Sequence, residues 1–447
     1  MTNTLPFTLQ VRTLAELSAI DRAALLRRSE QDIAALLPIA QAVIDRVRRD
    51  GDAAVIDYTR QFDALHYTAD QIKATPDDFA HAYDQVGADV VAAIRQAYKN
   101  IRRFHEEQMP EPMWFMDVAP GIMAGEKITP VASVGLYVPR GKGAFPSVTL
   151  MLGIPALVAG VQPILIVTPP NAEGKADAAS LVAADIAGIA DVYLVGGMQA
   201  VAALAFGTET IPRVAKIVGP GSSYVSAAKR LLYGTLDVGL PAGPSESIIF
   251  CDETADPLLA AIDLLVEAEH GPESAALLVT HDRALAGQIA ALLPQYIATL
   301  PDWRRKFVES VLGGYGGILL TGSVADSIVF INEYAPEHLE ILTADPFGTL
   351  SQIKNAGEIL LGPYTPIPTS NYTLGLNAIL PTGGFGRSFS SVSVWDFLKR
   401  SGIGYMTREG YDSIRKATAT LADYEGFPAH AQSIRVRDAR FKMDGEV

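Results

Sequence analysis

The sequence has almost no cysteine and no excess of positive charge. Of its 447 residues only Cys251 is a cysteine, which excludes an internal disulfide framework and any zinc finger built from cysteine ligands. A metal ion would have to use histidine, carboxylate or amide ligands. The formal net charge of -14 opposes binding to nucleic acid or anionic lipid, because both are negatively charged. We therefore expect no nucleic-acid partner and no membrane partner.

We also expect neither a targeting segment nor a membrane span. Residues 1–17 contain neither a basic start nor a long apolar run, so we predict no signal peptide and a cytoplasmic protein. Residues 144–172 carry no charge, but prolines such as Pro146, Pro155, Pro163 and Pro169 interrupt them. We expect a helix followed by a buried strand there, and no span.

Helical periodicity dominates residues 13–108, whereas from residue 131 short apolar runs such as "VGLYV" and "ILIVT" alternate with helical segments. This alternation is typical of α/β folds with parallel, doubly wound sheets. At roughly 100 to 200 residues per domain, the length predicts two to four domains. We predict a helical N-terminal region at 1–130 that packs partly with the second α/β unit, and a Rossmann-like nucleotide-binding α/β unit at 131–242. A second Rossmann-like α/β unit with metal and catalytic residues follows at 243–385. We expect residues 386–447 to form a C-terminal helical arm on a neighbouring subunit.

Three glycine-containing loops follow predicted strands of the first α/β unit. They are "YVPRGKGAFPS" from Tyr137, "VGGMQA" with Gln199 and "VGPGSSY" with Ser222. No GxGxxG motif follows a strand, which weakens an ordinary dinucleotide-binding interpretation. Ligands of parallel sheets bind beyond the carboxyl ends of the strands, so three such loops predict a nucleotide site at that edge. For any one loop alone, a simple corner between strand and helix remains the alternative.

Glu267 and His270 stand three residues apart at the end of a predicted helix, in "EAEHG". This spacing puts both side chains on one helix face, whereas Glu269 points elsewhere. Carboxylate and imidazole both bind Zn²⁺, so the pair predicts part of a metal site. A solvent-facing helix end explains the same spacing, and this stretch alone leaves both interpretations open.

Other polar residues stand where apolar patterns end. Glu337 and His338 precede a predicted strand, where a carboxylate beside an imidazole can act as an acid/base pair or simply occupy a loop. Asn371 lies in a Pro/Gly/Thr-rich segment that is longer than a connection needs. Glu425 and His430 lie near the C-terminus. Of the remaining histidines, we assign three to ordinary helix faces and one to a helix start: His66, His81, His105 and His281.

The segments "VGLYVP", "AGPSES", "EAEHG", "PEHLEI", "LPTGG" and the late "AH" together resemble histidinol dehydrogenases over nearly the whole chain. The resemblance implies a zinc-dependent enzyme that uses NAD to oxidise an amino alcohol through an aldehyde to the acid. It also implies a homodimer that exchanges C-terminal segments, so that each active site holds residues of both chains.

The resemblance also implies roles for single residues. Glu337 and His338 match the acid/base pair. His270 and His430 match two zinc ligands, the second supplied by the partner subunit. The residues that match substrate contacts are Ser245 and Glu425, and those that match nucleotide contacts are Tyr137 and Gln199.

Four positions depart from the family pattern. Glu267 stands where the family has a Gln ligand and Asn371 where it has an Asp ligand, so an amide and a carboxylate have changed places and the ligand charge is conserved. Our hypothesis is that zinc is retained, with Glu267 as its anionic ligand. Ala378 replaces a substrate-contacting His, which removes a polar contact to substrate. Ser222 replaces an Asn of the nucleotide loop.

We therefore predict a zinc- and NAD-dependent dehydrogenase of a small polar primary alcohol. L-histidinol is one candidate substrate. Another is an anionic alcohol such as sulfopropanediol, for which Arg140, Lys142 and Arg387 are the candidate cationic partners. The alternatives are a catalytically inactive nucleotide-binding paralogue and a metallohydrolase.

Overall fold

The computed structural model of the chain describes residues 9–28, 33–140, 143–240 and 242–443. Contacts between residues divide it into two compact units. The first comprises the residues up to 109 together with 131–397, and the second comprises 110–130 together with 398–447. Each unit is described by itself.

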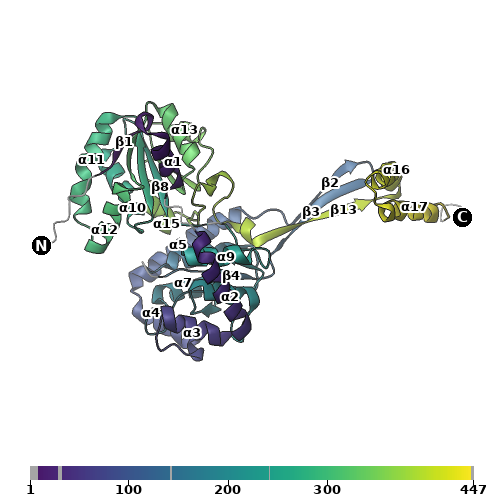
Figure 1. Ribbon diagram of the computed structural model, residues 1–447. Coiled ribbons are helices and arrows are strands. Elements are labelled where there is room, and N and C mark those ends of the chain that lie inside the picture. The colour runs from purple at the N-terminus through teal and green to yellow at the C-terminus, as the bar shows by residue number, and fades with distance from the viewer. Residues whose placement is uncertain (1–8, 29–32, 141–142, 241, 444–447) are drawn as a thin grey trace. The chain divides into compact units, whose positions relative to one another are not determined.

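A six-stranded sheet forms one part of the first unit, and all its neighbouring strands run parallel (Figure 1). In sheet order, its strands are β1 Val11–Thr13, β10 Gly317–Leu320, β9 Ala275–Thr280, β8 Glu246–Cys251, β11 His338–Leu342 and β12 Glu358–Leu361. β8, β9, β10 and β11 are buried along their whole length, as expected for a parallel sheet covered on both faces.

Helices cover both faces of this sheet. They are α1 Ala19–Arg27, α10 Pro257–Ala268, α11 Arg283–Ile297, α12 Asp302–Gly313, α13 Val324–Tyr334, α14 Pro346–Leu350 and α15 Ile367–Tyr372. Residues of α10, α11 and α12 share one core cluster with one strand face, while α1 and α13 pack in a second cluster with the other face. Because side chains alternate along a strand, His338 and Glu340 share the face of Leu342, which belongs to the α10 cluster.

A four-stranded parallel sheet forms the other part of the first unit. In sheet order, its strands are β6 Val192–Tyr193, β5 Ile164–Val167, β4 Val134–Tyr137 and β7 Lys216–Val218. The helices of this region are α2 Leu37–Asp50, α3 Asp52–Phe62, α4 Pro76–Gln85, α5 Ala88–Glu107, α6 Pro146–Val158, α7 Ala178–Ala187, α8 Gly197–Phe206 and α9 Ser223–Leu232.

The N-terminal part of the chain joins both sheets. α2, α4 and α5 contact α8, α7 and α6 beside the four-stranded sheet, whereas β1 pairs with β10 of the six-stranded sheet. The predicted fold class, two parallel α/β sheets with N-terminal helices and a helical C-terminal arm, is confirmed. The domain boundaries and the exchange of the arm stay predictions. Short 3₁₀ helices complete this unit at Leu14–Glu16, Ile33–Leu36, Ala69–Gln71, Phe385–Arg387 and Val394–Phe397.

The second unit contains an antiparallel sheet that the sequence analysis did not anticipate. Its strands, in sheet order, are β13 Leu398–Met406, β3 Ile122–Pro130 and β2 Met113–Ala119, and its helices are α16 Arg408–Tyr424 and α17 Pro428–Met443. Six of the seven residues of β2 are exposed, so the strand lacks the buried and solvent-facing alternation by which a strand is usually predicted.

Residues 144–172 form the predicted helix and strand, α6 followed by β5. Pro146 stands in the first turn of α6, where its missing N–H leaves no helical hydrogen bond unmade. Within the part of the chain that the structure describes, no helix combines the length and apolar character that a membrane span requires.

Candidate active site

Several polar residues gather at the amino edge of the six-stranded sheet. His338 is the first residue of β11 and Glu358 the first of β12, and these two are paired in register. His338 is also paired with Ser247 of β8, so Ser245 lies just before this edge. This group of residues therefore lies at the edge opposite to the carboxyl ends of the strands, where ligands of parallel sheets usually bind. In this sheet, helices that end and strands that begin supply the polar side chains.

α10 brings Glu267 and His270 to the same edge. Asp256 caps the helix by accepting hydrogen bonds from the N–H groups of Leu258 and Leu259, and Pro257 occupies the first turn. The helix runs back along the sheet from the end of β8, so its last turn reaches the amino edge. Glu267 is fully buried there.

A tight turn sets Glu337 and His338 in place. α13 ends at Ala335, whose φ of +51° lies in the left-handed region that alanine rarely occupies. Pro336 follows and stops the helix from continuing. Glu337 and His338 are both buried, at 7% and 3% exposed, which removes both side chains from bulk water.

Three carboxylates surround the ring of His338. Its Nε2 lies 3.8 Å from Oε1 of Glu337 and 3.9 Å from Oε1 of Glu267. Its Nδ1 lies 2.5 Å from Oε1 of Glu358, and the hydroxyl of Ser370 donates to the other oxygen of Glu358. Glu358 thereby fixes the ring and leaves Nε2 directed at Glu337 and Glu267, the arrangement that a carboxylate gives to a catalytic imidazole.

Glu267 links this group to His270 and Asn371. Nδ1 of His270 lies 2.9 Å from Oε2 of Glu267 and 3.0 Å from the hydroxyl oxygen of Ser245. Nδ2 of Asn371 donates to Oε1 of Glu267 over 3.4 Å. One buried carboxylate thus contacts an imidazole and an amide from separate segments, which brings together residues more than one hundred positions apart.

The charges in this group shift each other's pKa values. Burial alone would raise the pKa of Glu267, but the nearby rings of His270 and His338 outweigh it and lower that pKa to about 2. Burial would lower the pKa of His338, but Glu267 and the neighbouring carboxylates raise it to about 10. Glu267 is therefore the anionic centre of the site and holds His338 as imidazolium at neutral pH.

The pKa values of Glu337 and His270 also rise. Burial raises the pKa of Glu337 well above its ordinary value, and the charges of Glu267 and Glu246 add to this effect. The charge of Glu267 raises the pKa of His270. The neutral carboxyl of Glu337 and the imidazolium of His338 are both acid forms, so one of them must release its proton before the pair can act as an acid and a base.

The predicted nucleotide residues lie at the carboxyl edge of the four-stranded sheet. Tyr137 ends β4, and its hydroxyl oxygen accepts from the N–H of Gly197, which opens α8, over 3.0 Å. Gln199 is 1% exposed, and its Nε2 has no hydrogen-bond partner among the described residues. Ser222 is the N-cap of α9 and makes no capping bond with its side chain. The exposed hydroxyl of Ser222 and the helix start remain available to a ligand.

The loop between β7 and α9 approaches β4 closely. Gly219 has φ of +132°, and a Cβ at this position would overlap the carbonyl oxygen of Tyr137, so the approach requires glycine. Nζ of the buried Lys229 donates to the carbonyl of Gly219 over 2.8 Å. Burial lowers the pKa of Lys229 to about 8.

Glu425 and His430 belong to the second unit. Glu425 ends α16 and His430 lies in the first turn of α17, with its ring centroid 5.2 Å from that of Phe427. Both line a groove of about 400 Å³ between the two helices, together with apolar side chains of α16. The structure therefore brings these two residues together, while their relation to Glu267 and His270 stays a prediction.

Comparison with known proteins supplies the family. The family model described as histidinol dehydrogenase matches residues 26–438, which is most of the chain. The chain belongs to the histidinol dehydrogenase family.

Individual relatives of this family resemble the chain over nearly its full length. A Synechocystis protein named histidinol dehydrogenase is 56% identical over 414 residues, covering 93% of this chain and 95% of that protein. A Cereibacter sphaeroides protein named histidinol dehydrogenase homolog is 52% identical over 434 residues, covering 96% and 98%. The crystal structure of histidinol dehydrogenase from Elizabethkingia anophelis has a TM-score of 0.92 and 32% identity, covering 97% of this chain and 99% of that one.

The residues present fit the two cofactors expected of a histidinol dehydrogenase. Within the described ranges, no three His, Cys or carboxylate side chains gather as a metal site would require. Asn371 supplies an amide rather than one of these groups, however, and His430 belongs to the other unit. The first unit thus offers Glu267, His270 and Asn371 as a partial oxygen and nitrogen ligand set, which suits Zn²⁺. The unpartnered Nε2 of Gln199 suits the acceptor oxygens of a nucleotide.

Two residues of the site escaped the sequence analysis. Glu246 entered it only as part of the motif "AGPSES", and Glu358 was not considered. The usable signal was shared position, since Glu246, His338 and Glu358 are the first residues of three strands that lie side by side. Charged side chains that begin adjacent buried strands lie at the same edge of the sheet. They must pair with one another or with other polar groups there, because an unpaired buried charge is costly.

His105 corrects one interpretation of the sequence. We assigned it to an ordinary helix face, but it is fully buried in α5. Its Nδ1 lies 2.7 Å from the carbonyl oxygen of Ile101, and its Nε2 lies 3.3 Å from Nδ2 of Asn377, which also donates to the carbonyl of Met151. His105 and Asn377 therefore anchor the segment that carries Ala378.

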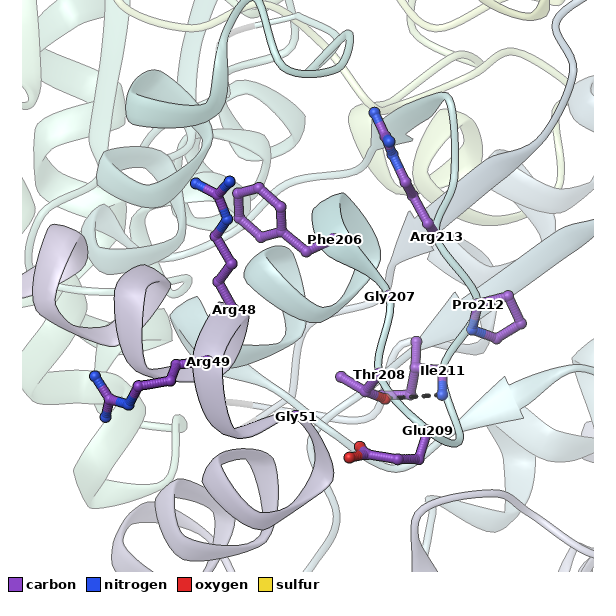
Figure 2. A pocket seen from close by; sticks show the side chains of 10 residues that line it. All are labelled: Arg48, Arg49, Gly51, Phe206, Gly207, Thr208, Glu209, Ile211, Pro212 and Arg213. Carbon is purple, nitrogen blue, oxygen red and sulfur yellow. Dashed lines mark hydrogen bonds between the residues drawn. The ribbon is translucent and has the colours of Figure 1, made fainter.

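A hollow of about 570 Å³ lies away from all candidate residues (Figure 2). It is lined by the end of α2 and the segment that follows α8, and the guanidinium of Arg48 lies 5.1 Å from the ring centroid of Phe206. Because α8 begins at the carboxyl edge of the four-stranded sheet, its end and this hollow lie toward the amino edge. The hollow is therefore not part of the predicted nucleotide site.

Proposed function

We propose that this chain is an NAD- and zinc-dependent dehydrogenase that oxidises a small polar primary alcohol, through an aldehyde to the carboxylic acid. The observation that carries the proposal is the buried cluster in which Glu337 and His338 face Glu267. An acid/base pair beside an anionic metal ligand is what alcohol oxidation by hydride transfer needs from the protein.

Each residue of the cluster has a role in this proposal. With the charge of Glu267 compensated by a bound metal ion, His338 would be neutral. Its Nε2 then takes the proton of the substrate alcohol, while Glu358 holds its Nδ1. Glu337 exchanges protons with His338, and in its ionised form it activates the water that attacks the aldehyde in the second oxidation. Burial of both side chains keeps other proton donors away during transfer.

Two bound groups complete the chemistry. Glu267, His270 and Asn371 would hold Zn²⁺ together with His430 of a second chain, and Tyr137, Gln199 and Ser222 would bind NAD. When bound, NAD accepts hydride, and Zn²⁺ polarises the alcohol oxygen and compensates the charge of Glu267. Ser245 and Glu425 would contact the substrate.

The substrate class follows from what the site offers. The names of the relatives support L-histidinol as the first compound to test. Ala378 offers a methyl group and no polar contact, which favours a substrate without the imidazole of histidinol. An anionic alcohol such as sulfopropanediol is the second candidate. Arg140 and Arg387 already donate to the carbonyl groups of Lys175 and Glu333, and Lys142 lies outside the described residues.

NADH formation tests the proposal directly. The purified protein, loaded with zinc, is incubated with NAD and a panel of primary alcohols that includes L-histidinol and sulfopropanediol. We expect turnover with at least one compound and loss of turnover after zinc is removed by a chelator. His338→Ala should lower kcat by roughly 10²-fold or more, as loss of a general base does.

Two other outcomes would replace the proposal. A thermal shift with NAD but no turnover on any alcohol would mean a nucleotide-binding paralogue without catalysis. Hydrolytic activity without any response to NAD would mean a metallohydrolase. In either case the parent protein would form no NADH, and Glu337→Gln could not lower it further.

A further inference from the structure

Arg28 is a buried charge that the proposed reaction does not use. It follows α1, has a φ of +59° and is 6% exposed. Its Nη1 lies 3.1 Å from both carboxylate oxygens of Glu246, its Nη2 donates to the carbonyl of Tyr334, and its guanidinium carbon lies 3.7 Å from the centroid of the Tyr334 ring. A guanidinium removed from water needs such partners, because an unpaired buried charge is costly.

All these partners adjoin Glu337. The carbonyl of Ala335 also lies 3.5 Å from Nη2 of Arg28, so Arg28 holds two carbonyl groups of the left-handed turn that delivers Glu337. Glu246 reaches the same side chain by another route, because its backbone N–H donates to Oε2 of Glu337 over 2.7 Å. Arg28 thus contacts both segments that position Glu337.

The carboxylate of Glu246 is itself held from two sides. Besides Arg28, the N–H of Gly383 donates to its Oε1 over 2.8 Å. These two contacts fix the first residue of β8 and therefore the direction of its backbone N–H. With Oε2 of Glu337 engaged by that N–H, Oε1 is the oxygen left to face Nε2 of His338.

We infer that Arg28 and Glu246 are positioning residues for Glu337. Arg28 forms hydrogen bonds to the turn before Glu337 and to the carboxylate of Glu246. The backbone N–H of Glu246 in turn binds one carboxylate oxygen of Glu337, so that the other oxygen faces His338. The inference rests on the proposed function, in which Glu337 and His338 exchange protons. Neither Arg28 nor Glu246 is assigned contact with the substrate.

The matched control is a second ion pair of the same helix. Arg22 of α1 bonds Glu333 of α13, but both side chains are more than a third exposed and neither contacts Glu337. Arg22→Met removes an ion pair between α1 and α13 and leaves the contacts of Arg28 with Glu246, Tyr334 and Ala335 unchanged. Arg28→Lys keeps the positive charge but cannot form the fork of hydrogen bonds, and Glu246→Gln keeps the shape of the side chain without its charge.

Kinetics and hydrogen exchange together test the inference. In Arg28→Lys and Glu246→Gln, kcat should fall roughly 10- to 100-fold while KM for alcohol and NAD changes less than about threefold, since misplacement of a reacting group acts on the chemical step. The backbone N–H groups of Tyr334, Ala335, Glu337 and His338 should exchange at least about tenfold faster than in the parent protein. Arg22→Met should change neither quantity.

The outcomes separate this inference from the proposed function. If the parent protein oxidises no alcohol, the proposed function fails, and the exchange rates still decide whether Arg28 holds the turn. Unchanged exchange at 334–338 in both variants overturns the inference, as does parental kcat in a folded Arg28→Lys protein. If Arg28→Lys does not fold, Glu246→Gln decides by the same two measurements.

Discussion

At the scale of single residues, Glu267 organises the site. It is fully buried and contacts His270 and Asn371, with His338 just beyond at 3.9 Å. A buried carboxylate is stable only with compensating partners, and here those partners are two imidazole rings and an amide. Our hypothesis is that the negative charge has moved to this position from 371, because the family resemblance implies Gln at 267 and Asp at 371.

The charge exchange predicts how zinc affinity responds to substitution. Glu267→Gln leaves two amides and no carboxylate beside His270, so zinc affinity should fall at least roughly tenfold, more than loss of an outer hydrogen-bond partner costs. The double variant with Asn371→Asp restores one carboxylate and should regain most of that affinity. Metal content after dialysis against a defined zinc concentration measures both.

Glu269 supplies the control for this experiment. It follows the same helix, and its side chain is 41% exposed, so Glu269→Gln should leave zinc content at the parental value. Full zinc content in Glu267→Gln would contradict the hypothesis that Glu267 is the anionic ligand.

Glu358 should matter for rate rather than for binding. Glu358→Gln keeps the size of the side chain but removes the charge beside Nδ1 of His338, and the new amide group can favour the wrong tautomer. We expect kcat to fall by a factor on the order of 10² to 10⁴ with little change in zinc content, by analogy with a catalytic histidine that loses its carboxylate.

The pH dependence gives this prediction a sign. Because a negative charge next to the ring raises the pKa of His338, its removal should move the corresponding limb of the kcat profile to lower pH. Ser370→Ala leaves the carboxylate in place and should change kcat much less. A Glu358→Gln enzyme within about twofold of the parental kcat would show that Glu358 does not orient His338.

At the scale of elements, two acidic side chains lie next to each other between α10 and β11, in addition to the carboxylates around His338. Glu340 of β11 is fully buried, and both its carboxylate oxygens lack a hydrogen-bond donor among the described residues. Burial and the adjacent Asp263 of α10 raise the pKa of Glu340 to about 9, and burial raises the pKa of Asp263 as well. Two carboxyl groups in this arrangement share one proton at neutral pH.

The shared proton predicts a loss of stability as pH rises. The folded protein keeps a proton that the unfolded chain releases above a pKa of about 4.3, so the free energy of unfolding should decrease between that pH and about 9. The limiting slope for one proton is about 1.4 kcal/mol per pH unit.

Glu340→Gln isolates this effect, because the amide is neutral at every pH and can donate to Asp263. Urea unfolding at about pH 6 and about pH 8 should show a smaller decrease for the variant than for the parent protein. Equal decreases in the two proteins would mean that Glu340 is already ionised at neutral pH.

The elements also show what a sequence can reveal. Buried parallel strands such as β8 and β9 are runs of apolar residues with a clear signal, and they were predicted. β2 and β13 were not, because their exposed residues carry no alternating pattern. Glu267, His270, Glu337 and His338 were found as local pairs. Glu358 and Arg28 were not, because their importance depends on strand order and on a helix three hundred residues away.

At the scale of the whole molecule, the second unit raises the question of its partner. It exposes large apolar side chains, and its groove holds Glu425 and His430. The most exposed apolar residues on its strands and helices are Val118, Tyr405, Leu421 and Tyr424. A homodimer with shared active sites accounts for both properties, since it would cover apolar surface and complete the metal site.

Mixed dimers test this arrangement. Dissociated His338→Ala and His430→Ala chains are combined and allowed to re-associate. If each site draws His338 from one chain and His430 from the other, half of the dimers are mixed and each has one intact site, so about one quarter of parental activity should return.

A second pair of variants serves as the control. Glu337→Gln and His338→Ala alter the same unit, so no mixed dimer of these two has an intact site, and no activity should return. If the His338→Ala and His430→Ala mixture also stays inactive while mixed dimers form, His430 does not act across an interface.

The pairing of β1 with β10 has a consequence for synthesis of the chain. β1 is the first strand made, yet its partner in the sheet is about three hundred residues further along. The four strands of the smaller sheet all lie between residues 134 and 218, so this region can fold while translation continues. The six-stranded sheet cannot, because β10, β11 and β12 must first leave the ribosome. The partners of Arg28 at Tyr334 and Ala335 are also made late. A nascent chain stalled before residue 317 would therefore complete the four-stranded sheet before it could assemble the cluster around His338.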